Sequence, residues 1–485
     1  MAAIAFERDT AKGAGRRLRS VGGRALAALR ARPALAVSLV SVALVEAGFA
    51  GLEPEARRAL QIFLLALVGW TLTRLDDAFV ALAAALGMAI FVLDEPDEMF
   101  EALGHEIVWL MVAAFVLAAA ARAAGLTDRL AAFALARART PRQAFHALSA
   151  IMLASAFVAP STSGRAAMMV PIFERVASGR DAAGRKALAL LFPTVILLSA
   201  FASLTGAGAH ALAAEILDEI GDGEIGFLGW ALYGLPFAAA STALAAETIL
   251  RLFAPKDPAA AFAAPALDVA PLDRRAWSVL AILAGVLIGW LSEPLHGVDE
   301  TVVALIGACA AATPTVGAVD FRSAVKGVEW PLIVFMASTV VLAEGLDDSG
   351  LVKTAAGAAF APLREIGLPP LAWLVALGAV GLLSHLVIHS RTARVAVLLP
   401  PALIAAEGAG VSTLAAMLTL VAATGFCQLL MVSAKPVALF GQLPGGSYGA
   451  ADLLRLGAAL LPLQLALIAL FAGVVWPLLG LDLAR

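Results

Sequence analysis

Charged residues and cysteine are both scarce in this chain of 485 residues. Only 15% of the residues are charged, 61% are hydrophobic, and the mean hydropathy is +0.91. A soluble protein of this length cannot cover so much apolar surface, which excludes the soluble globular class and predicts lipid as the solvent. Because backbone polar groups must be paired within lipid, we expect an all-α polytopic membrane protein.

The two cysteines, Cys309 and Cys427, lie in separate apolar stretches. Their number and spacing exclude a disulfide framework and a cysteine metal site. The sequence also lacks a long hydrophilic insertion, a nucleophile paired with a base, and an acid pair on a cytoplasmic loop. We therefore expect no attached soluble domain, no enzyme, and no cofactor or metal. The basic N-terminus is expected to meet anionic lipid, and nucleic-acid binding is not expected.

Apolar runs and turn-forming residues divide the chain into two halves of similar pattern. A Pro/Ala-rich stretch in the middle marks a linker between them. The predicted segments are a basic cytoplasmic N-terminus (1–33), a first transmembrane helix (34–53), a first inverted repeat (54–253), a cytoplasmic linker (254–273) and a second inverted repeat (274–485).

One polar pattern occurs in both halves. Ser161 and Arg165 in the first half match Ser390 and Arg394 in the second at one constant spacing, and a proline follows each pair. A polar break inside a membrane segment that occurs twice is typical of a transporter whose binding site lies between two inverted repeats. The predicted re-entrant hairpins are an inner one at about 143–176 and an outer one at about 367–406.

Basic and acidic residues occupy different loops. Arg137, Arg139 and Arg142 precede the inner hairpin, whereas the loops at 94–98 and 218–224 are acidic. By the positive-inside rule, the N-terminus is predicted to be cytoplasmic and the C-terminus outside, with about eleven transmembrane helices. We expect a multi-pass protein of a bacterial-type inner membrane.

Each half also has a long apolar span that small and turn-forming residues interrupt. The first break contains Gly206 and His210, and the second contains Ser433 and Lys435. Such breaks free backbone groups, which a membrane tolerates only where they face protein, water or a ligand. Two hairpin tips and two broken spans are therefore expected to converge near the membrane midplane.

Arginines at the hairpin tips have no acidic residue in the segments around them. A buried cation without a partner costs a few kcal/mol or more, so we infer that the partner is an anionic ligand. The planar guanidinium and nearby hydroxyl groups suit carboxylate, sulfate or phosphate oxygens. The predicted substrate-binding residues are Ser161, Thr162, Ser163, Arg165, Gly206, His210, Ser390, Arg391, Thr392, Arg394, Ser433 and Lys435.

Other interpretations of the same residues remain open. Lys435 can extend to the end of its span, the histidines can be hydrogen-bonded core residues, and the glycines can ease helix packing. The arginines can instead pair with acids from other spans, such as Glu46, Asp77, Glu247 or Glu344.

The paired pattern resembles that of the divalent anion/sodium symporter (DASS) family. The resemblance extends over almost all of the chain after residue 50. That family has Ser-Asn-Thr at each hairpin tip, where this chain has Ser-Thr-Ser (161–163) and Ser-Arg-Thr (390–392), and Pro171 and Pro400 match the prolines of the family. The resemblance implies dicarboxylate, tricarboxylate or sulfate-like substrates and a homodimer. It also implies an elevator mechanism, in which a mobile transport domain carries both hairpins past a scaffold.

The departures from the family pattern change the expected mechanism. Thr162 and Arg391 replace the two asparagines, and Arg165 and Arg394 replace the second threonine of each motif. In the family these regions also bind sodium, whereas a guanidinium offers no acceptor and repels a cation. We therefore predict a sodium-independent exchanger or uniporter of small divalent anions. A sodium-coupled symporter remains the alternative, and an anion-sensing membrane receptor is a more remote one.

Overall fold

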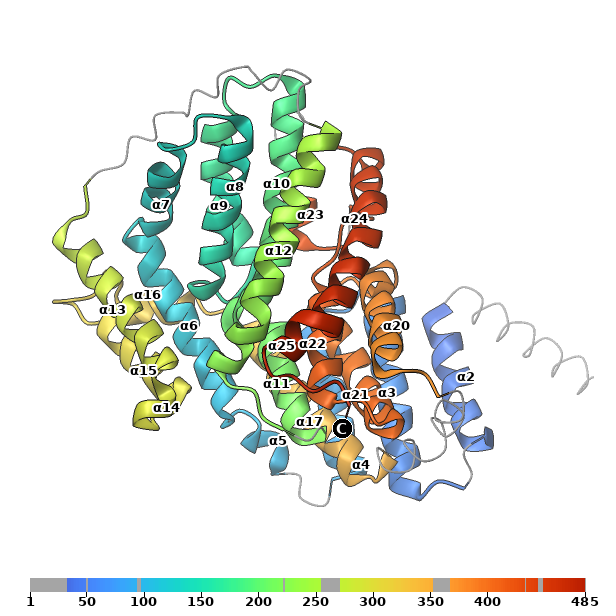
Figure 1. Cartoon of the computed structure of the whole chain (residues 1–485). Coiled ribbons are helices and arrows are strands. Elements are labelled where there is room, and N and C mark those ends of the chain that lie inside the picture. Colours follow the sequence, from blue (N-terminus) through green and yellow to red (C-terminus); the bar gives the residue numbers. More distant parts are fainter. Residues whose placement is uncertain are drawn as a thin grey trace, which may run out of the picture.

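The computed structural model describes residues 33–48, 51–93, 97–220, 223–253, 271–351, 367–431, 433–443 and 448–484. Within these ranges the regular structure is helical (Figure 1), apart from one isolated bridge between Val411 and Ala484. This confirms the predicted all-α class. The predicted N-terminal segment and linker fall largely on residues 1–32 and 254–270, which lie outside the described ranges.

The described helices form two groups in the chain, before and after residues 254–270. The first half contains α2 (Pro33–Gly48), α3 (Pro54–Leu72), α4 (Asp77–Phe91), α5 (Glu98–Glu101), α6 (Glu106–Ala123), α7 (Leu126–Leu135), α8 (Pro141–Ala154), α9 (Thr162–Ala177), α10 (Ala182–Ser199), α11 (Gly208–Ile220) and α12 (Phe227–Phe253). The second contains α13 (Arg274–Leu291), α14 (Glu293–His296), α15 (Glu300–Ala311), α16 (Phe321–Lys326), α17 (Trp330–Asp348), α20 (Pro370–Leu383), α21 (Arg391–Ala409), α22 (Thr413–Thr424), α23 (Lys435–Gly441), α24 (Ala450–Leu470) and α25 (Trp476–Leu478).

Each segment predicted as a hairpin is a pair of helices joined by a short tip. α8 leads into the 3₁₀ turn Ser155–Phe157 and α9 begins after Ser161, while α20 leads into the 3₁₀ turn Ser384–Leu386 and α21 begins after Ser390. The two serine hydroxyls accept hydrogen bonds from the first turns of α9 and α21, at 3.1 and 3.3 Å. Both tips therefore have the N-cap chemistry that starts a helix.

Both of the spans predicted to be broken are interrupted helices. α10 is followed by two 3₁₀ turns, Ala200–Ala202 and Leu204–Gly206, before α11 begins. The residues between α22 and α23 are likewise not helical where the structure describes them. A Cβ atom at Gly206 would collide with the carbonyl oxygen of Ala200, so glycine is what allows the chain to turn back so closely.

An aromatic cluster holds the inner hairpin to both broken spans. Phe173 of α9, Phe192 of α10 and Phe440 of α23 are fully buried, and their ring centroids lie 5.5–5.6 Å apart. Edge-to-face packing at this distance adds to the stabilisation from apolar burial. On the other side of the molecule, α17 packs against α4 and α11. Residues far apart in sequence are thereby fixed around one central region.

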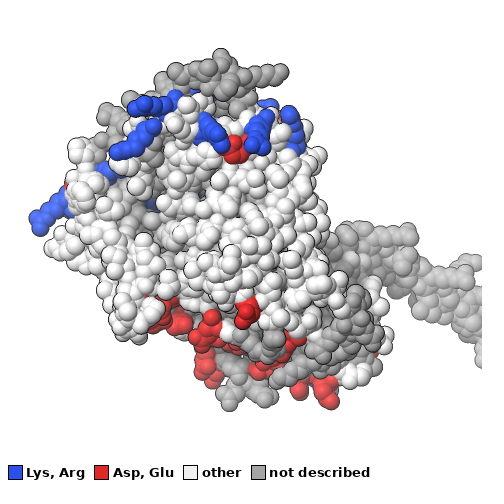
Figure 2. Space-filling view, viewed as in Figure 1, with Lys and Arg blue, Asp and Glu red and all other residues white. Residues whose placement is uncertain are grey.

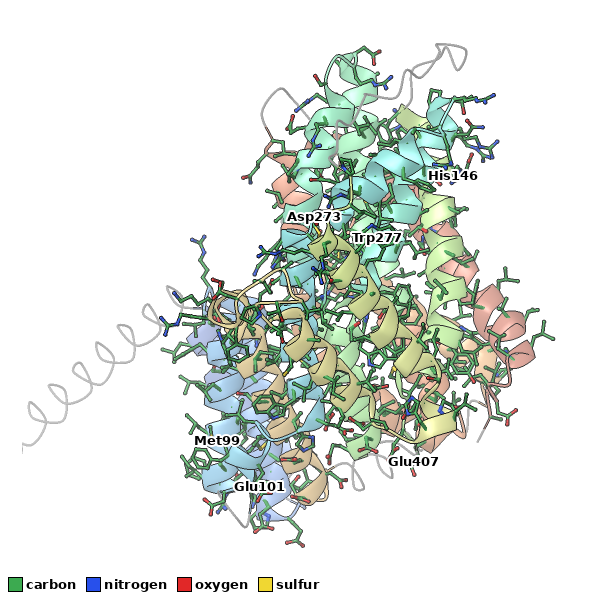
Figure 3. All side chains as sticks on the ribbon, turned by 90° about the vertical axis from the view of Figure 1, so that its left-hand side faces the viewer. Met99, Glu101, His146, Asp273, Trp277 and Glu407 are labelled. Carbon is green, nitrogen blue, oxygen red and sulfur yellow. The ribbon has the colours of Figure 1, made fainter. Side chains whose placement is uncertain are left out.

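The surface charge divides the molecule into two ends. Figure 2 shows Lys and Arg gathered at one end, Asp and Glu at the other, and a band of uncharged residues between them. We call them the basic face, which carries Arg137 and Arg142, and the acidic face, which carries Glu101 and Glu407. Figure 3 shows His146 near the basic face and Glu101 and Glu407 at the acidic face. Such a band is typical of a protein that spans a bilayer.

Seven of the described helices are long and apolar enough to cross a membrane. Several others are apolar but shorter, including α4, α15 and α22. The chain is thus a polytopic helical membrane protein, while the count of about eleven spans stays a prediction. The placement of the basic face on the cytoplasmic side also stays a prediction.

We expect Gly206→Ala to destabilise the protein, because the added methyl group overlaps the carbonyl oxygen of Ala200. This oxygen belongs to the backbone, so it cannot move aside as the end of a side chain can. Overpacking of this kind costs about 1–3 kcal/mol. The measurement is the midpoint of thermal unfolding in detergent. Gly285→Ala in α13 is the matched control, because nothing lies within 4 Å of its added Cβ. An unfolding midpoint for Gly206→Ala equal to that of Gly285→Ala would contradict the assigned close approach.

Candidate functional site

A cavity of about 530 Å³ lies where the two hairpin tips meet the two broken spans. The N-terminal ends of α4 and α17 also line this cavity. It is lined by Asp76, Asp77, Ala78, Pro160, Ser161, Thr162, Ser163, Leu197, Ala207, Gly208, Ala209, Glu329, Pro331, Leu332, Phe335, His389, Ser390, Arg391, Thr392, Arg394, Ala434, Lys435 and Pro436. Eight of the twelve residues predicted from the sequence are therefore brought together: Ser161, Thr162, Ser163, Ser390, Arg391, Thr392, Arg394 and Lys435.

Several helices begin at the wall of this cavity. α9, α11 and α21 start there with 16, 13 and 19 residues, and α4 and α17 start there with 15 and 19. The first N–H groups of a helix have no partner within the helix, and its N-terminal end carries a partial positive charge. Because the ends of α9, α11 and α21 bring no acidic side chain, they favour an anion at this place.

Arg391 reaches the cavity from the start of α21. Its Nε donates to Thr424 Oγ1 at 3.4 Å and its Nη2 donates to the Val421 carbonyl oxygen at 3.3 Å. Its Nη1 is buried and has no hydrogen-bond partner among the described residues. Both bonds are long, so the guanidinium has donor capacity left for an oxyanion.

Arg394 lies one turn further along α21 and is fully buried. Nη1 donates to the carbonyl oxygen of Phe426 at 3.4 Å, and Nη2 contacts Cys427 Sγ at 2.9 Å. Its Nε is also without a partner in the described part of the chain. Like Arg391, it forms no ion pair with a described carboxylate within 4.0 Å. The second hairpin thus places two incompletely satisfied guanidinium groups at one side of the cavity.

Arg165 is fully buried and points elsewhere, since it is absent from the cavity wall. Its Nε donates to Ser155 Oγ at 3.0 Å, and Nη1 donates to the carbonyl oxygen of Ile196 at 3.0 Å. Nη2 donates to Ser199 Oγ at 2.6 Å and to the carbonyl oxygen of Met152. These acceptors lie near the C-terminal ends of α8 and α10, where the helix dipole favours a cation. Arg165 therefore joins α8, α9 and α10 without facing the cavity.

Gly206, His210 and Ser433 also lie outside the cavity wall. His210 is fully buried, its Nδ1 hydrogen-bonds the Ser203 carbonyl oxygen at 2.9 Å, and its ring stacks on Trp230 at 5.1 Å. Ser433 donates to the carbonyl oxygen of Cys427 at 2.6 Å. These contacts shape the breaks, and the breaks in turn present neighbouring backbone, including Gly208, to the cavity.

Three acidic residues in the cavity wall were not predicted as part of the site. Asp76 is the N-cap of α4, with its side chain accepting from the first turn. Asp77 follows it, and its carboxylate lies near the Ser390 side chain, Lys435 and His389. Glu329 precedes α17, and its carboxylate lies close to Gly164 at the inner tip.

The sequence contained a partial signal for one of these acids. Of the four acids that the sequence offers as partners for the arginines, only Asp77 lies in the cavity wall. Glu46 pairs with Arg57 at 3.3 Å, and Glu247 pairs with Arg142 at 2.6 Å. Glu344 lies 3.8 Å from His105 on the acidic face.

The cavity therefore combines cationic groups from the second hairpin and α23 with carboxylates from α4 and α17. Arg391, Arg394 and Lys435 can bind the oxygens of an anion together with hydroxyl groups of both tips. Asp77 and Glu329 offer oxygen ligands of the kind that hard cations prefer. The donor set suits a small oxyanion.

Known proteins resemble this chain along most of its length. The family model described as the sodium:sulfate symporter transmembrane region matches residues 29–481. The citrate/succinate antiporter of Escherichia coli K12 is 23% identical over 470 residues, covering 89% of this chain and 94% of that protein. Dicarboxylate transporter 2, chloroplastic, of Spinacia oleracea is 25% identical over 460 residues, covering 89% and 79%. The putative malate transporter YflS of Bacillus subtilis is 22% identical over 341 residues, covering 67% and 70%.

Two solved transporter structures are similar in fold. The YdaH transporter of Alcanivorax borkumensis gives a TM-score of 0.53 at 16% identity, covering 87% of this chain and 100% of the other. MtrF of Neisseria gonorrhoeae, described as an antimetabolite efflux pump, gives 0.52 at 13% identity, covering 88% and 97%. At this identity the likeness concerns the helical architecture alone.

We expect Arg165→Gln to lower stability strongly, because it removes a donor that satisfies four buried acceptors. Each hydrogen bond to a charged group contributes roughly 1.5–3 kcal/mol. The measurement is thermal unfolding in detergent without any added anion. Arg137→Gln is the matched control, because Arg137 is exposed on the basic face. Unchanged unfolding of Arg165→Gln would show that the guanidinium does not hold α8, α9 and α10 together.

Proposed function

The chain belongs to the sodium:sulfate symporter (DASS) family of membrane transporters, and from that premise we propose that it carries small divalent anions across the membrane without sodium. It is a transporter and not an enzyme. The observation that carries the proposal is a cavity lined by Arg391 and Arg394, each of which has a buried donor without a partner among the described residues, beside the N-terminal ends of α9, α11 and α21.

Dicarboxylates are the proposed substrate class. Two relatives are named for citrate/succinate and for dicarboxylates, and a third is named as a putative malate transporter. A cavity of about 530 Å³ is large enough for a four-carbon dicarboxylate and its hydration water. One carboxylate would meet Arg391 and Arg394, and the other would meet the hydroxyl groups and helix ends of the inner tip. Sulfate fits the same donors.

The proposed independence from sodium rests on the charge already present in the site. A divalent anion needs two positive charges nearby to enter a region of low dielectric constant without a large penalty. Arg391, Arg394 and Lys435 supply three fixed cations on the second hairpin and α23, and the carboxylates of Asp76, Asp77 and Glu329 at the starts of α4 and α17 offset them in this conformation. Arg165 contributes its charge at longer range, because its donors are used within the protein.

The fixed positive charge of the second hairpin and α23 also favours exchange over uniport, if these elements move away from the carboxylates of α4 and α17. Moving an uncompensated charge across the membrane costs about 2.3 kcal/mol per charge per 100 mV, besides desolvation. Return of the site without an anion is therefore slow in the proposed mechanism. We further propose an elevator movement of the two hairpins and both broken spans, a homodimer, and a cytoplasmic basic face, all of which follow the family resemblance and the positive-inside rule.

A sodium-coupled symporter is the second candidate function. The family description names sodium, and the carboxylates of Asp76, Asp77 and Glu329 in the cavity wall are suitable ligands for a hard cation. In this alternative a sodium ion would bind beside the anion at the starts of α4 and α17.

Counterflow into liposomes separates the two candidates. Purified protein is reconstituted into vesicles loaded with unlabelled succinate, and labelled succinate is added outside in either Na⁺ or choline buffer. The expected result is rapid uptake that is equal in both buffers and that disappears when the vesicles contain no anion. Uptake that needs Na⁺ and proceeds without internal anion would favour the symporter instead.

The same assay includes variants that tie the uptake to the cavity. Arg391→Gln removes a guanidinium that has an unused N–H group. We expect the uptake rate at low substrate concentration to fall by roughly tenfold or more, because one charge-assisted contact with the anion is lost. Arg137→Gln on the basic face is the control and should transport normally. No counterflow by the wild type in either buffer, despite succinate binding, would favour a receptor.

Asp77→Asn tests whether the carboxylate competes with the anion for the same donors. Asp77 lies near Lys435, so its neutralisation should strengthen succinate binding. We expect an effect of several-fold, which corresponds to about 1 kcal/mol for a charge well screened by water. The measurement is the succinate-dependent thermal shift, which reports binding to the folded state. Asp97→Asn on the acidic face is the control. Weaker binding in Asp77→Asn would mean that the carboxylate helps the anion, for example through a cation.

A further inference from the structure

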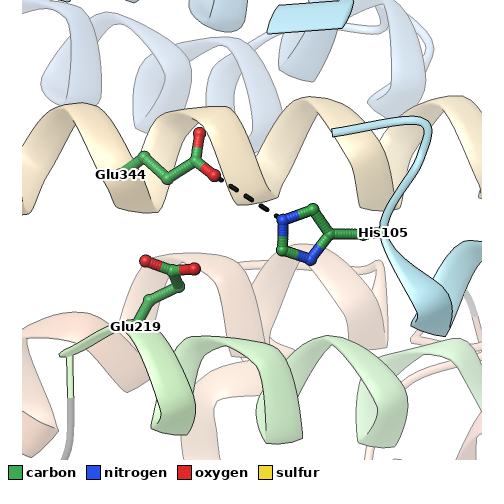
Figure 4. Close-up of side chains that lie close together, drawn as sticks. All are labelled: His105, Glu219 and Glu344. Carbon is green, nitrogen blue, oxygen red and sulfur yellow. Dashed lines mark ion pairs between the residues drawn. The ribbon is translucent and has the colours of Figure 1, made fainter. Parts of the chain in front are cut away.

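A second group of polar residues lies on the acidic face, away from the central cavity. His105 stands just before α6, Glu344 lies near the end of α17, and Glu215 and Glu219 lie one turn apart near the end of α11. None of the four lines the central cavity. Figure 4 shows the side chains of His105, Glu219 and Glu344 pointing toward one another from three different elements.

The spacing of these side chains fits one metal ion. One ligand atom each from His105, Glu219 and Glu344 can be chosen so that all three lie within 4.8 Å of one another. Ligands at the usual 2.0–2.2 Å from a zinc ion lie roughly 3–4 Å apart, so small rotations of the side chains suffice. The three side chains are partly buried, which restricts their movement.

Glu215 supplies an independent indication, because it orients the imidazole. Its carboxylate contacts His105 Nδ1, while His105 Nε2 lies 3.8 Å from Glu344 Oε1. Metal-binding histidines usually give one ring N–H to a carboxylate, which turns the lone pair of the other nitrogen toward the metal. The contact with Glu215 fixes the ring with Nε2 turned toward Glu344.

The charge of the group also calls for a cation. Three glutamates surround one histidine, so negative charge exceeds positive charge even when the imidazole is protonated. Asp218 and Asp347 interact electrostatically with Glu219 and add to the excess. An unbalanced group of carboxylates in a partly buried place is unfavourable unless a cation is bound or protons are taken up.

We propose that His105 Nε2, Glu219 and Glu344 bind one divalent transition-metal ion of the zinc class, with Glu215 as the residue that positions His105. Mixed imidazole and carboxylate ligands are typical of zinc and its neighbours, whereas calcium and magnesium prefer oxygen alone. Three protein ligands leave a coordination position for water. The binding itself does not depend on the transport function proposed above.

The site would join parts of the protein that the proposed mechanism requires to separate. Glu219 belongs to α11, the second half of a broken span, whereas His105 and Glu344 belong to α6 and α17. If the broken spans move with the hairpins, as the proposed function states, a bound ion holds the protein in one conformation. Zinc on the acidic face should then slow anion exchange.

Zinc binding is tested on the purified full chain after treatment with a chelator. Isothermal titration with Zn²⁺ alone is expected to show one tight site per chain, and Zn²⁺ should raise the unfolding midpoint. Glu219→Gln should weaken binding by roughly tenfold or more, since even supporting residues of metal sites contribute 10–100-fold. This variant leaves the contacts of His105 with Glu215 and Glu344 in place. Glu101→Gln, an exposed acid on the same face, is the matched control.

Cobalt provides a second measurement that reports on the ligands. Co²⁺ bound to the wild type should give a visible absorption band that changes in His105→Gln. No zinc binding by the wild type, or equal affinity in Glu219→Gln and Glu101→Gln, would overturn the proposed site. If zinc binds but does not slow counterflow, the metal site is supported and its proposed link to the movement is contradicted. If zinc binds to a protein that shows no counterflow, the metal site is supported and the proposed transport function is contradicted.

Discussion

The need to satisfy backbone polar groups within lipid shapes this protein more than any other constraint. Four membrane segments stop or turn inside the molecule, at Ser155–Ser161, Ser203–Gly208, Ser384–Ser390 and the residues before Lys435. Their free N–H and C=O groups cannot face hydrocarbon. They are tolerated because they lie inside the protein, where residues of all four breaks line the central cavity. The positive ends of several helices then lie in one place, which gives the site its preference for anions.

The internal repeat supplies equivalent positions, yet the two halves use them differently. Arg165 and Arg394 stand at the same register, but the first is surrounded by the hydroxyls of Ser155 and Ser199 and by two carbonyl oxygens. In the second half, Ser384 donates to the Gly381 carbonyl oxygen as Ser155 does to that of Met152, but the described bonds of Arg394 go to Phe426 and Cys427 and not to Ser384. Cys427 offers Arg394 only a weak sulfur acceptor. One arginine is thus used up in holding helices together, while the other keeps donor capacity.

The different surroundings of Arg165 and Arg394 show which features of the fold and the site could be predicted from the sequence. The hairpins, the broken spans and their convergence follow from local signals, because serine N-caps, glycine and proline act on neighbouring residues. The direction of Arg165 depends on Ser199, which lies on another helix, and no local pattern carries that information. Asp77 and Glu329 were not predicted as site residues for the same reason, since each acts as an ordinary helix start until tertiary packing brings it to the tips.

The arrangement of charge around the cavity bears on movement as well as on binding. The cations Arg391, Arg394 and Lys435 stand on the second hairpin and α23, whereas Asp77 and Glu329 stand at the starts of α4 and α17. If the hairpins shift relative to α4 and α17, the cations leave these carboxylates behind and their charge is no longer offset. A bound dianion travels with the cations and replaces the carboxylates as their partner. The same fixed charges that attract the substrate would therefore make its presence a condition for crossing the membrane.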